Sequence, residues 1–463
     1  MLEPSVIRDL RKIVGAVNLL TETEELTVYA YDATRLAAVP DAVARPATAE
    51  EVSRLLLLAN RTPFAVVPRG AGTGMSGGSV PLRGGVVLSF ERMNRIVEID
   101  EPNRVAVAEP GVITGDLQRE AEARGLFYPP DPASSAFCTI GGNVAECAGG
   151  LRAVKYGVTK DYVLGLEVVL PTGEIIRTGA RTAKSVAGYD LTRLLIGSEG
   201  TLGVVTKIII RLLPLPERVE TLAAFFHDRS ASLAVLPAVT ARRIMPRTLE
   251  FVDGAALGAA ERHLKVPPSG AAAMLLIETD GATETAFREI GEIEAICRDA
   301  GAFEVRRARD RQEQAALWKL RKSISPALYA IKPVKISEDI VVPVSRIAAS
   351  LDAIDRVAAR HGLLIVNFGH AGDGNIHTNV MLEEHERKKA EQAVREILET
   401  VIGLQGSITG EHGIGISKAA YLPIEAGKDA LAVMKKIKDA LDPNHILNPG
   451  KIFLDGEGGR HGG

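Results

Sequence analysis

Three glycine-rich segments in the first half of the chain constrain its fold more than any other feature. The first, PRGAGTGMSGG at 68–78, directly follows a strand predicted over Phe64–Pro68. The second lies in short pieces between 139 and 157, and the third is GSEGTLGVV at 197–205. Clustered glycine marks backbone that must approach another group closely, because glycine carries no Cβ. Singly each segment could be a turn, but together and in this order they predict a binding site.

The first segment is suited to hold a phosphate group. Backbone N–H groups on glycine-rich turns form concave anion sites, and Thr73, Ser76 and Arg69 can add hydroxyl donors and charge. Strands rather than a long helix follow it, and it lacks the GK[ST] ending of a nucleoside triphosphate loop. We therefore expect a phosphate-bearing cofactor on another scaffold. The alternative for this segment alone is a glycine-rich hairpin tip.

Composition restricts the class of protein. The 463 residues predict two or three domains. With 55 basic and 58 acidic residues the chain has no basic surplus, which argues against a nucleic-acid binder. The three cysteines, Cys138, Cys147 and Cys297, form no CxxC pair, so no zinc ribbon, iron–sulfur cluster or disulfide framework is expected.

The same composition bears on location. The N-terminal segment MLEPSVIRDLRKIVG is typical of an amphipathic helix and not of a signal peptide. No stretch of about 20 apolar residues is present, so we expect no membrane-spanning segment. A cytoplasmic protein is predicted, with peripheral attachment to a membrane as the alternative.

The order of predicted elements divides the chain near Pro214 and Pro216. Before this point a strand–helix–strand opening leads into mostly short strands, and after it long helices alternate with strands. We predict a first domain at 1–216 with its core at 41–216, a second at 217–440, and a terminal segment at 441–463 that ends in a mobile tail, GEGGRHGG. The long helices are expected at 230–241, 285–300, 310–329, 344–360 and 385–402.

Histidines cluster in the second half of the chain. GHAGDGNIH at 369–377 places His370 and His377 around a glycine-rich turn between two predicted strands, and GEHGIG at 410–415 adds Glu411 and His412. Two imidazoles and a carboxylate with open positions are a common site for a divalent metal. The alternative is that these histidines cap strands and donate to backbone carbonyl groups.

Residues 41–216 resemble the FAD-binding domain of the vanillyl-alcohol oxidase family. The matching segments are PRGAGTGMSGG, AEPGV, TIGGNVAECAGG, KYGVTKDYV and GSEGTLGVVTK, in this order. The resemblance implies an α+β flavoprotein of PCMH-type architecture, in which two α+β subdomains bind FAD and a substrate (cap) domain carries an antiparallel sheet and helices. It implies these FAD-binding residues: Arg69, Gly70, Ala71, Gly72, Thr73, Gly74, Ser76, Gly77, Pro110, Gly111, Thr139, Gly142, Asn143, Gly149, Gly150, Gly200, Val204 and Asn448.

The FAD is expected to be bound without a covalent link. Many members of the family tether FAD through a histidine or a cysteine, but the first histidine of this chain is His227. A histidyl tether in the first domain is therefore excluded. Cys138 and Cys147 lie in a segment that resembles the non-covalent members.

The second half resembles the D-lactate, glycolate and D-2-hydroxyglutarate dehydrogenases of the same flavin family. GHAGDGNIH, GEHGIG and NPGK carry this resemblance. It implies His370, His377 and Glu411 as ligands of Zn²⁺ or Mn²⁺, and His412 as the base. It also implies that Arg321 binds the substrate carboxylate, with a solvated helix charge as the alternative, and that Asn448 of NPGK returns the chain to the flavin.

The implied reaction is the FAD-dependent oxidation of a small D-2-hydroxy acid to the 2-keto acid. The flavin N5 accepts a hydride, the metal polarises the hydroxyl group, and His412 takes its proton. One alternative is another flavin oxidoreductase of the superfamily, acting on an alcohol, an aldonolactone or an ether lipid. Another is an FAD-binding subunit of a multi-subunit glycolate or lactate oxidase complex.

The electron acceptor is expected to be a protein partner. The chain has neither an iron–sulfur motif nor a membrane segment, so reduced flavin must pass its electrons elsewhere. An iron–sulfur subunit and an electron-transfer flavoprotein are the predicted partners, and a quinone, a cytochrome or oxygen are the alternatives.

Overall fold

A computed structural model of the chain describes residues 2–454 and divides into two compact units. Among the described residues, the first unit comprises 2–148, 158–215 and 411–454, and the second comprises Gly149–Gly157 and Pro216–Gly410. The chain leaves the first unit after Leu215, beside the predicted boundary. The segment 411–440, which sequence analysis placed in the second domain, is grouped with the first unit. The predicted mobile tail at 456–463 lies outside the described residues.

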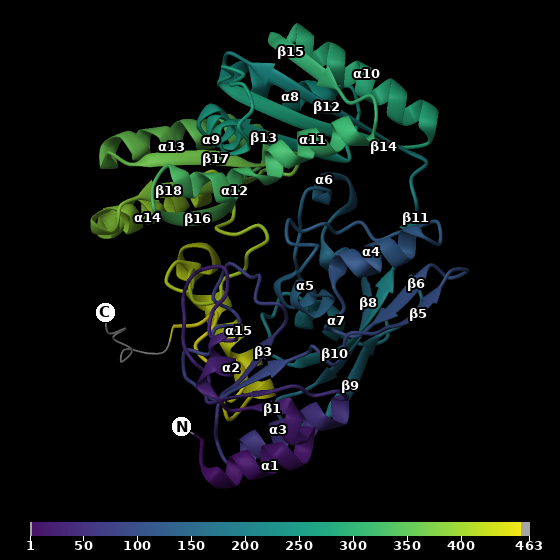
Figure 1. The fold of residues 1–463 in the computed structure, drawn as a ribbon, viewed down its shortest axis with the longest axis vertical. Coiled ribbons are helices and arrows are strands. Elements are labelled where there is room, and N and C mark those ends of the chain that lie inside the picture. The colour runs from purple at the N-terminus through teal and green to yellow at the C-terminus, as the bar shows by residue number, and fades with distance from the viewer. Residues whose placement is uncertain (1, 455–463) are drawn as a thin grey trace. The chain divides into compact units, whose positions relative to one another are not determined.

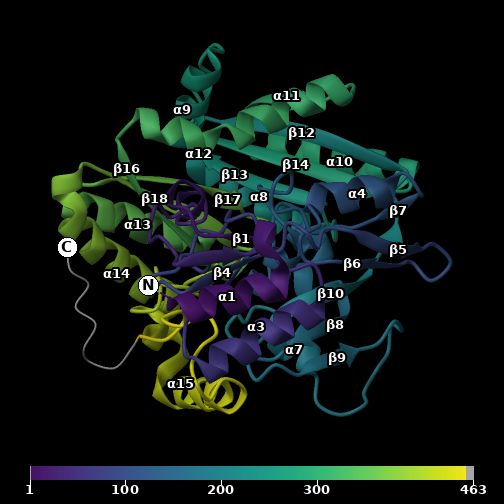
Figure 2. The same ribbon diagram turned by 60° about the horizontal axis from the view of Figure 1, so that its bottom comes forward.

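The first unit begins with a small α/β subdomain around a four-stranded sheet. Two parallel pairs, β2 with β4 and β3 with β4, form its centre, and β1 pairs with β2 in the antiparallel sense. Thr48 caps α3 by accepting a hydrogen bond from the Glu51 N–H. Helices α1 and α3 lie side by side (Figure 2). The elements are α1 (Pro4–Val14), β1 (Leu19–Leu20), α2 (Thr23–Thr27), β2 (Ala42–Ala44), α3 (Ala49–Arg61), β3 (Val66–Arg69) and β4 (Val86–Ser89).

The second subdomain of this unit is built on a five-stranded antiparallel sheet in the order β5-β6-β10-β8-β9. Helix α5, which carries the second glycine segment, packs on β10, and α7 packs on β8 and β9. Alternate side chains of β10 are buried, as expected for a strand with one face on the core. The elements are β5 (Ile96–Asp100), β6 (Val105–Ala108), α4 (Thr114–Glu122), α5 (Ile140–Glu146), β8 (Val163–Val169), β9 (Ile175–Gly179), α7 (Leu191–Leu195) and β10 (Val204–Arg211).

The C-terminal segment belongs to the small α/β subdomain. After α15 (Leu422–Leu441), Leu447 forms a parallel bridge with Val66 of β3, and the Asn448 N–H donates to the Val66 carbonyl. A short antiparallel pair, β7 (Leu126–Phe127) with β11 (Leu213–Pro214), completes the unit.

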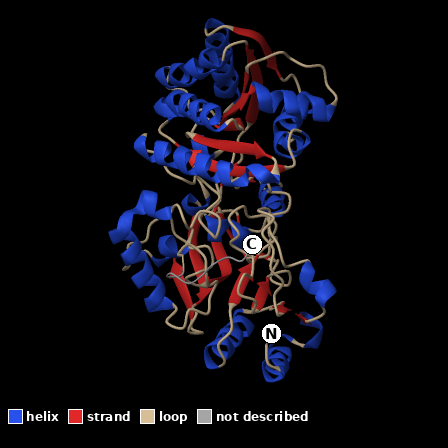
Figure 3. Cartoon of the chain, turned by 90° about the vertical axis from the view of Figure 1, so that its left-hand side faces the viewer, coloured by secondary structure: helices blue, strands red, loops and turns tan. Residues whose placement is uncertain are grey.

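The second unit is a seven-stranded antiparallel sheet with helices on both faces (Figures 1 and 3). Its order is β15-β12-β14-β13-β17-β18-β16. One helical layer consists of α8 (Arg229–Ala241), α10 (Thr283–Asp299), α13 (Ile347–His361) and α14 (Arg387–Gly403), and the other consists of α9 (Gly254–Leu264), α11 (Arg311–Lys322) and α12 (Ile324–Ala327). The strands are β12 (Arg218–Phe226), β13 (Thr248–Asp253), β14 (Ala273–Gly281), β15 (Ala302–Arg307), β16 (Val334–Val341), β17 (Leu364–His370) and β18 (Asn375–Leu382).

A nine-residue excursion, Gly149–Gly157, adds the short helix α6 (Ala153–Tyr156) to the second unit. Asp280 of β14 is fully buried and accepts from Lys155 Nζ at 2.5 Å and from the Tyr156 hydroxyl at 2.8 Å. Arg247 Nη1 lies 2.6 Å from the same carboxylate. Because a buried carboxylate requires such partners, the excursion completes the polar cluster around Asp280.

These arrangements confirm the predicted fold class. The first unit holds two α+β subdomains, and the second combines an antiparallel sheet with helices. Among residues 2–454, no helix combines the length and the apolar character needed to cross a membrane.

Candidate functional site

The three glycine segments converge on one cleft of the first unit. A Cβ on Gly70 would overlap Thr139 Oγ1, and a Cβ on Gly141 would lie 2.5 Å from the Pro110 Cβ. Gly200 packs against Pro68, with its notional Cβ at 3.4 Å. The backbones of segments far apart in sequence therefore approach closely, and only glycine permits this at Gly70 and Gly141.

Most residues predicted to bind FAD line this cleft. The first glycine segment and the start of α5 line the cleft, and Val204 supplies an apolar wall. Glu411 and His412 of the same unit also line the cleft. The predicted residues on its wall are Arg69, Gly70, Ala71, Gly72, Thr73, Gly74, Pro110, Thr139, Gly142, Asn143, Gly200 and Val204.

Six residues of the predicted FAD set lie away from this lining. Ser76, Gly77, Gly111 and Asn448 pack in the first unit around the cleft, and Gly149 and Gly150 belong to the second unit. The Ser76 carbonyl accepts from the N–H groups of Ile416 and Ser417, and the Gly111 N–H donates to the Met93 carbonyl. Asn448 Nδ2 donates to the carbonyls of Gly78 and Glu199. Direct contact of these six residues with FAD remains a prediction.

Arg69 supplies positive charge beneath the first glycine segment. Its guanidinium occupies the space that a Cβ on Gly72 would need, and Gly72 has a φ of +69°. Its Nη1 donates to Ser79 Oγ at 3.2 Å. The side chain is 6% exposed, and burial lowers the pKa of Arg69 from its ordinary value. The charge is therefore held close to the loop backbone, where an anion would bind.

Glu199 is a functional candidate that sequence analysis missed. Its carboxylate lines the cleft and accepts from the N–H groups of Ile414 at 2.7 Å and Gly415 at 2.6 Å. Burial raises the pKa of Glu199 to about 7 against the lowering effect of these hydrogen bonds. The residue ties the segment after His412 to the third glycine segment. Its position within GSEGTLG could have indicated a functional role, because a simple glycine-rich turn does not require a carboxylate.

The histidines lie on one face of the sheet in the second unit. His370 ends β17 and His377 lies on β18, with Phe368 directly opposite His377. A tight turn joins the strands, and at Gly374 (φ +88°) a Cβ would overlap the Val342 carbonyl. The two imidazoles meet edge to face, with centroids 5.1 Å apart. The hairpin register thus brings both rings to one point.

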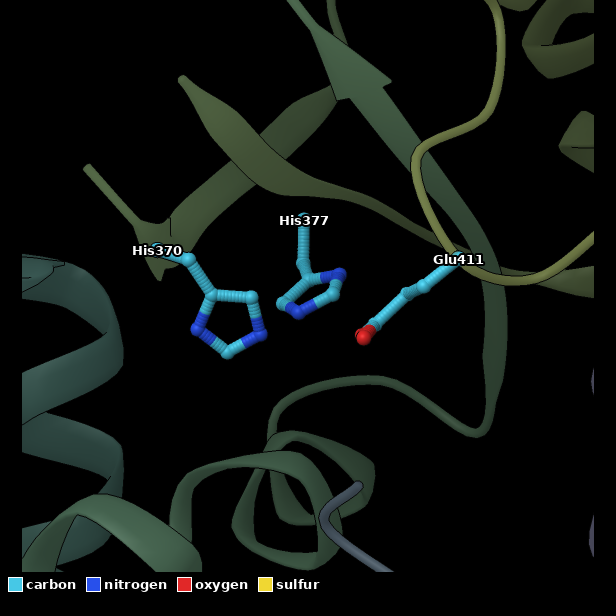
Figure 4. Close-up of side chains that lie close together, drawn as sticks. All are labelled: His370, His377 and Glu411. Atoms are coloured by element: carbon cyan, nitrogen blue, oxygen red, sulfur yellow. The ribbon is translucent and has the colours of Figure 1, made fainter. Parts of the chain in front are cut away.

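Glu411 reaches the histidines because the residue before it is anchored to the same sheet. Asp339 of β16 lies directly opposite His377 and is fully buried. Its carboxylate accepts from Thr409 Oγ1 at 3.1 Å and from the Gly410 N–H at 2.9 Å. The ligand atoms of His370, His377 and Glu411 lie within 4.8 Å of one another (Figure 4). Two imidazoles and a carboxylate match the donor set of Zn²⁺ or Mn²⁺ and leave positions for a substrate.

A second buried carboxylate, Glu250 of β13, contacts both His370 and Arg321. Its Oε1 lies 2.6 Å from His370 Nδ1, and its Oε2 lies 2.8 Å from Arg321 Nε. Burial alone would raise the pKa of Glu250, but the charges of His370 and Arg321 lower it to about 2. Sequence analysis identified both partners and missed this carboxylate between them.

Arg321 is buried rather than a solvated helix charge. It lies in the last turn of α11, is 7% exposed, and stacks over the Phe368 ring at 4.7 Å from the centroid. The guanidinium therefore belongs to the same sheet face as the histidines.

Two family models match the chain. One, described as "FAD binding domain", matches residues 40–179, and the other, "FAD linked oxidases, C-terminal domain", matches residues 215–452. The glycolate oxidase subunit GlcD of Bacillus subtilis (strain 168) is 47% identical, over 98% of this chain and 97% of its own. A D-lactate dehydrogenase of Anaerostipes hadrus is 37% identical, over 89% of each chain. A D-2-hydroxyglutarate dehydrogenase of Stutzerimonas stutzeri (strain A1501) is 35% identical, over 98% of this chain and 100% of its own.

Solved structures of similar fold are more distant in sequence. p-Cresol methylhydroxylase with substrate bound superposes with a TM-score of 0.81 at 20% identity, over 97% of this chain and 96% of its own. Alkyldihydroxyacetonephosphate synthase superposes with a TM-score of 0.77 at 19% identity, over 97% and 86%. At such identities the likeness concerns the fold alone, and it confirms the predicted PCMH-type architecture.

Proposed function

Because the chain belongs to the family of FAD-linked oxidases, we propose that it oxidises a small D-2-hydroxy acid to the 2-keto acid. Relatives that cover nearly the whole chain are named for glycolate, D-lactate and D-2-hydroxyglutarate. These three compounds share a hydroxyl group on the carbon next to a carboxylate. The observation that carries the proposal is the convergence of His370, His377 and Glu411 near a buried arginine.

The cleft of the first unit holds FAD in this proposal. FAD, when bound, supplies the hydride acceptor for the substrate carbon. The glycine backbone around Gly70–Gly74 donates N–H groups to the pyrophosphate, and Arg69 adds charge. Burial raises the pKa of Cys147, which disfavours the thiolate that a tether at this residue would need. We propose non-covalent binding, which the resemblance of the segment around Cys138 and Cys147 to non-covalent members implies.

In this proposal, side chains on the sheet face of the second unit bind the substrate. The residues that follow this unit in the chain complete the site and accept the proton of the substrate hydroxyl group. His370, His377 and Glu411 would bind Zn²⁺ or Mn²⁺, which when bound supplies Lewis acidity to the hydroxyl oxygen. His412, the residue after Glu411, lines the cleft and accepts the hydroxyl proton as the general base. Arg321 binds the substrate carboxylate through the edge of its guanidinium that Glu250 does not occupy.

We further propose that electrons leave the flavin for a protein partner. The relative that is 47% identical is named as a subunit of glycolate oxidase. An iron–sulfur subunit or an electron-transfer flavoprotein fits this role, and a quinone or a cytochrome is the alternative. Anaerobic titration of the reduced protein against each class of acceptor tests the proposal. Rapid reoxidation by oxygen alone would contradict it.

One experiment tests the central proposal. The purified, yellow protein is assayed with D-lactate, glycolate, D-2-hydroxyglutarate and D-malate, using a dye as electron acceptor. A chelator should abolish turnover of the preferred acid without releasing FAD, and Zn²⁺ or Mn²⁺ should restore it. Unchanged turnover after chelation would favour another flavin oxidoreductase of the superfamily.

A second candidate function is an FAD-binding subunit that needs its complex for activity. The name of the Bacillus relative favours it. A protein that is yellow, retains its metal and remains inert on all four acids until partner subunits are added would support this candidate over the independent dehydrogenase.

A further inference from the structure

The Glu250 carboxylate divides its two oxygens between two groups of different function. Oε1 contacts His370 Nδ1 at 2.6 Å. Oε2 contacts Arg321 Nε at 2.8 Å and Arg321 Nη2 at 2.6 Å. The Glu250 side chain is fully buried, so water does not compete for either oxygen. One carboxylate therefore joins a proposed metal ligand to the proposed substrate arginine.

The sheet sets this arrangement through its register. Glu250 of β13 lies directly opposite His370 of β17, so the two side chains leave the same face as neighbours. Arg321 descends onto that face from α11, and its guanidinium is stacked over Phe368, two residues before His370. Strand pairing and one aromatic contact thus hold both partners against a single carboxylate.

Each contact has a chemical consequence for the group it orients. A proton on His370 Nδ1, donated to Glu250, leaves the Nε2 lone pair available to a metal. In Figure 4 the other ring nitrogen of His370 points toward His377 and Glu411. Glu250 also occupies the Nε and Nη2 edge of Arg321, which leaves Nη1 to a ligand; no described residue accepts a hydrogen bond from it.

We propose that Glu250 is a positioning residue that fixes the metal ligand and the carboxylate-binding arginine relative to each other. This inference rests on the proposed function, because it assumes that His370 binds a metal and that Arg321 binds a substrate carboxylate. Glu250 itself touches neither ligand. Its role is to keep a constant distance between the metal ligand His370, which serves the substrate hydroxyl group, and Arg321, which binds the substrate carboxylate. This distance selects acids with the hydroxyl group on the carbon next to the carboxylate.

The variant Glu250→Gln separates the two roles of the carboxylate. A glutamine presents one oxygen and one NH₂ group, so it can accept from His370 or from Arg321 but not from both. Loss of such an outer contact costs about 10–100-fold in metal affinity. We expect Glu250→Gln to bind Zn²⁺ about 10–100-fold more weakly, measured at fixed pH by competition with a chromophoric chelator, and to raise the KM for the preferred hydroxy acid.

Glu278 on the neighbouring strand β14 provides a matched control. It is also a buried carboxylate, accepts from Trp318 Nε1 at 2.6 Å and pairs with Arg247 at 3.3 Å. Trp318 lies one turn before Arg321 on α11, so Glu278 anchors the same helix without touching His370 or Arg321. Glu278→Gln should leave Zn²⁺ affinity within about twofold of wild type. Equal Zn²⁺ affinity in wild type and Glu250→Gln would overturn the inference, as would equal weakening in both variants.

A measurement on the wild-type protein guards against a variant that does not fold. In the zinc-loaded, ¹⁵N-histidine-labelled protein, His370 should carry its proton on Nδ1, and the resonance is assigned by its loss in His370→Asn. A proton on Nε2 would overturn the inference even if no variant can be purified. If wild type and His377→Ala bind Zn²⁺ equally weakly, the proposed metal site fails and the inference fails with it. If wild type binds Zn²⁺ tightly and only the Glu250→Gln result disagrees, the proposed function stands and this inference alone is overturned.

Discussion

The cleft of the first unit is formed mainly by closely packed backbone, whereas the histidine face of the second unit is formed by side chains. In the cleft, glycine backbone from segments far apart in sequence packs closely, as at Gly70 with Thr139 and Gly141 with Pro110. On the sheet face, side chains such as His377 and Asp339 meet because antiparallel strands pair in one register. The first arrangement depends on the absence of side chains and the second on their exact partners across strands.

This difference teaches that the two regions should fail separately. A substitution that adds bulk to the cleft should remove FAD and leave the sheet face intact. A substitution on the sheet face should abolish turnover and leave FAD bound.

The largest expected effect is the loss of a proposed metal ligand. His377→Ala should lower kcat on the order of 10³-fold, because a Lewis acid contributes several kcal/mol to such a reaction. Flavin absorbance per protein should not change. His385→Ala, at an exposed position of the same unit, is the control and should retain full activity. Parallel loss of FAD in His377→Ala would remove the distinction between the two regions.

The next effect concerns the cleft of the first unit, where added bulk should weaken FAD binding. In Gly141→Ala the new methyl group would lie 2.5 Å from the Pro110 Cβ and 2.9 Å from Pro110 backbone, so the second glycine segment must shift. We expect at least about tenfold weaker FAD binding, equal to about 1.4 kcal/mol, measured by flavin retention during dialysis. Zn²⁺ affinity should stay unchanged. Gly291→Ala in α10 meets nothing within 4 Å and should increase stability by about 0.5–1 kcal/mol.

A smaller effect concerns pH and the carboxylate of the cleft. The pKa of Glu199 is raised to about 7, so the native state holds a proton that the unfolded chain releases near its ordinary value of 4.5. The contribution of Glu199 to stability is therefore fully present below about pH 4.5 and is lost as the pH rises toward about 7, by up to about 1.4 kcal/mol per pH unit.

Urea unfolding across this pH range measures how steeply the free energy of unfolding changes with pH. Glu199→Gln should flatten this slope, since glutamine does not titrate. Glu98→Gln, which alters an exposed ion pair with Arg181, should leave the slope as it is in wild type. A slope that is identical in wild type and Glu199→Gln would show that other groups control this pH dependence.

Local patterns allowed much of the fold to be predicted. The cap of α3 at Thr48 and the boundary after Leu215 follow from short signals that need no tertiary contact. The helix expected at 310–329 instead breaks at Ser323 into α11 and α12, with Pro326 inside the second piece. Helix α9, which begins at Gly254 and packs against α11 and α12, was missed, because glycines at 254 and 258 weaken the helical signal of its alanines.

The candidate site could be predicted only in part. His370, His377 and Glu411 lie in short, recognisable segments, whereas the carboxylates around them do not. Glu250 is 120 residues from His370, and Glu199 is 215 residues from Ile414. Each reaches its partner through pairing or packing that a single sequence does not display. Reasoning from motifs therefore found the groups expected to touch ligands and missed the groups that orient them.

The excursion at Gly149–Gly157 has a consequence for how this protein can be divided or recombined. The polypeptide crosses between the units four times, so the second unit is not one uninterrupted stretch of the gene. A fragment limited to 216–410 would lack Lys155 and Tyr156, and the buried Asp280 would lose two of its partners. Chimaeras that exchange the second unit between relatives must carry these nine residues along with it, because the excursion binds Asp280, which lies far from it in the chain.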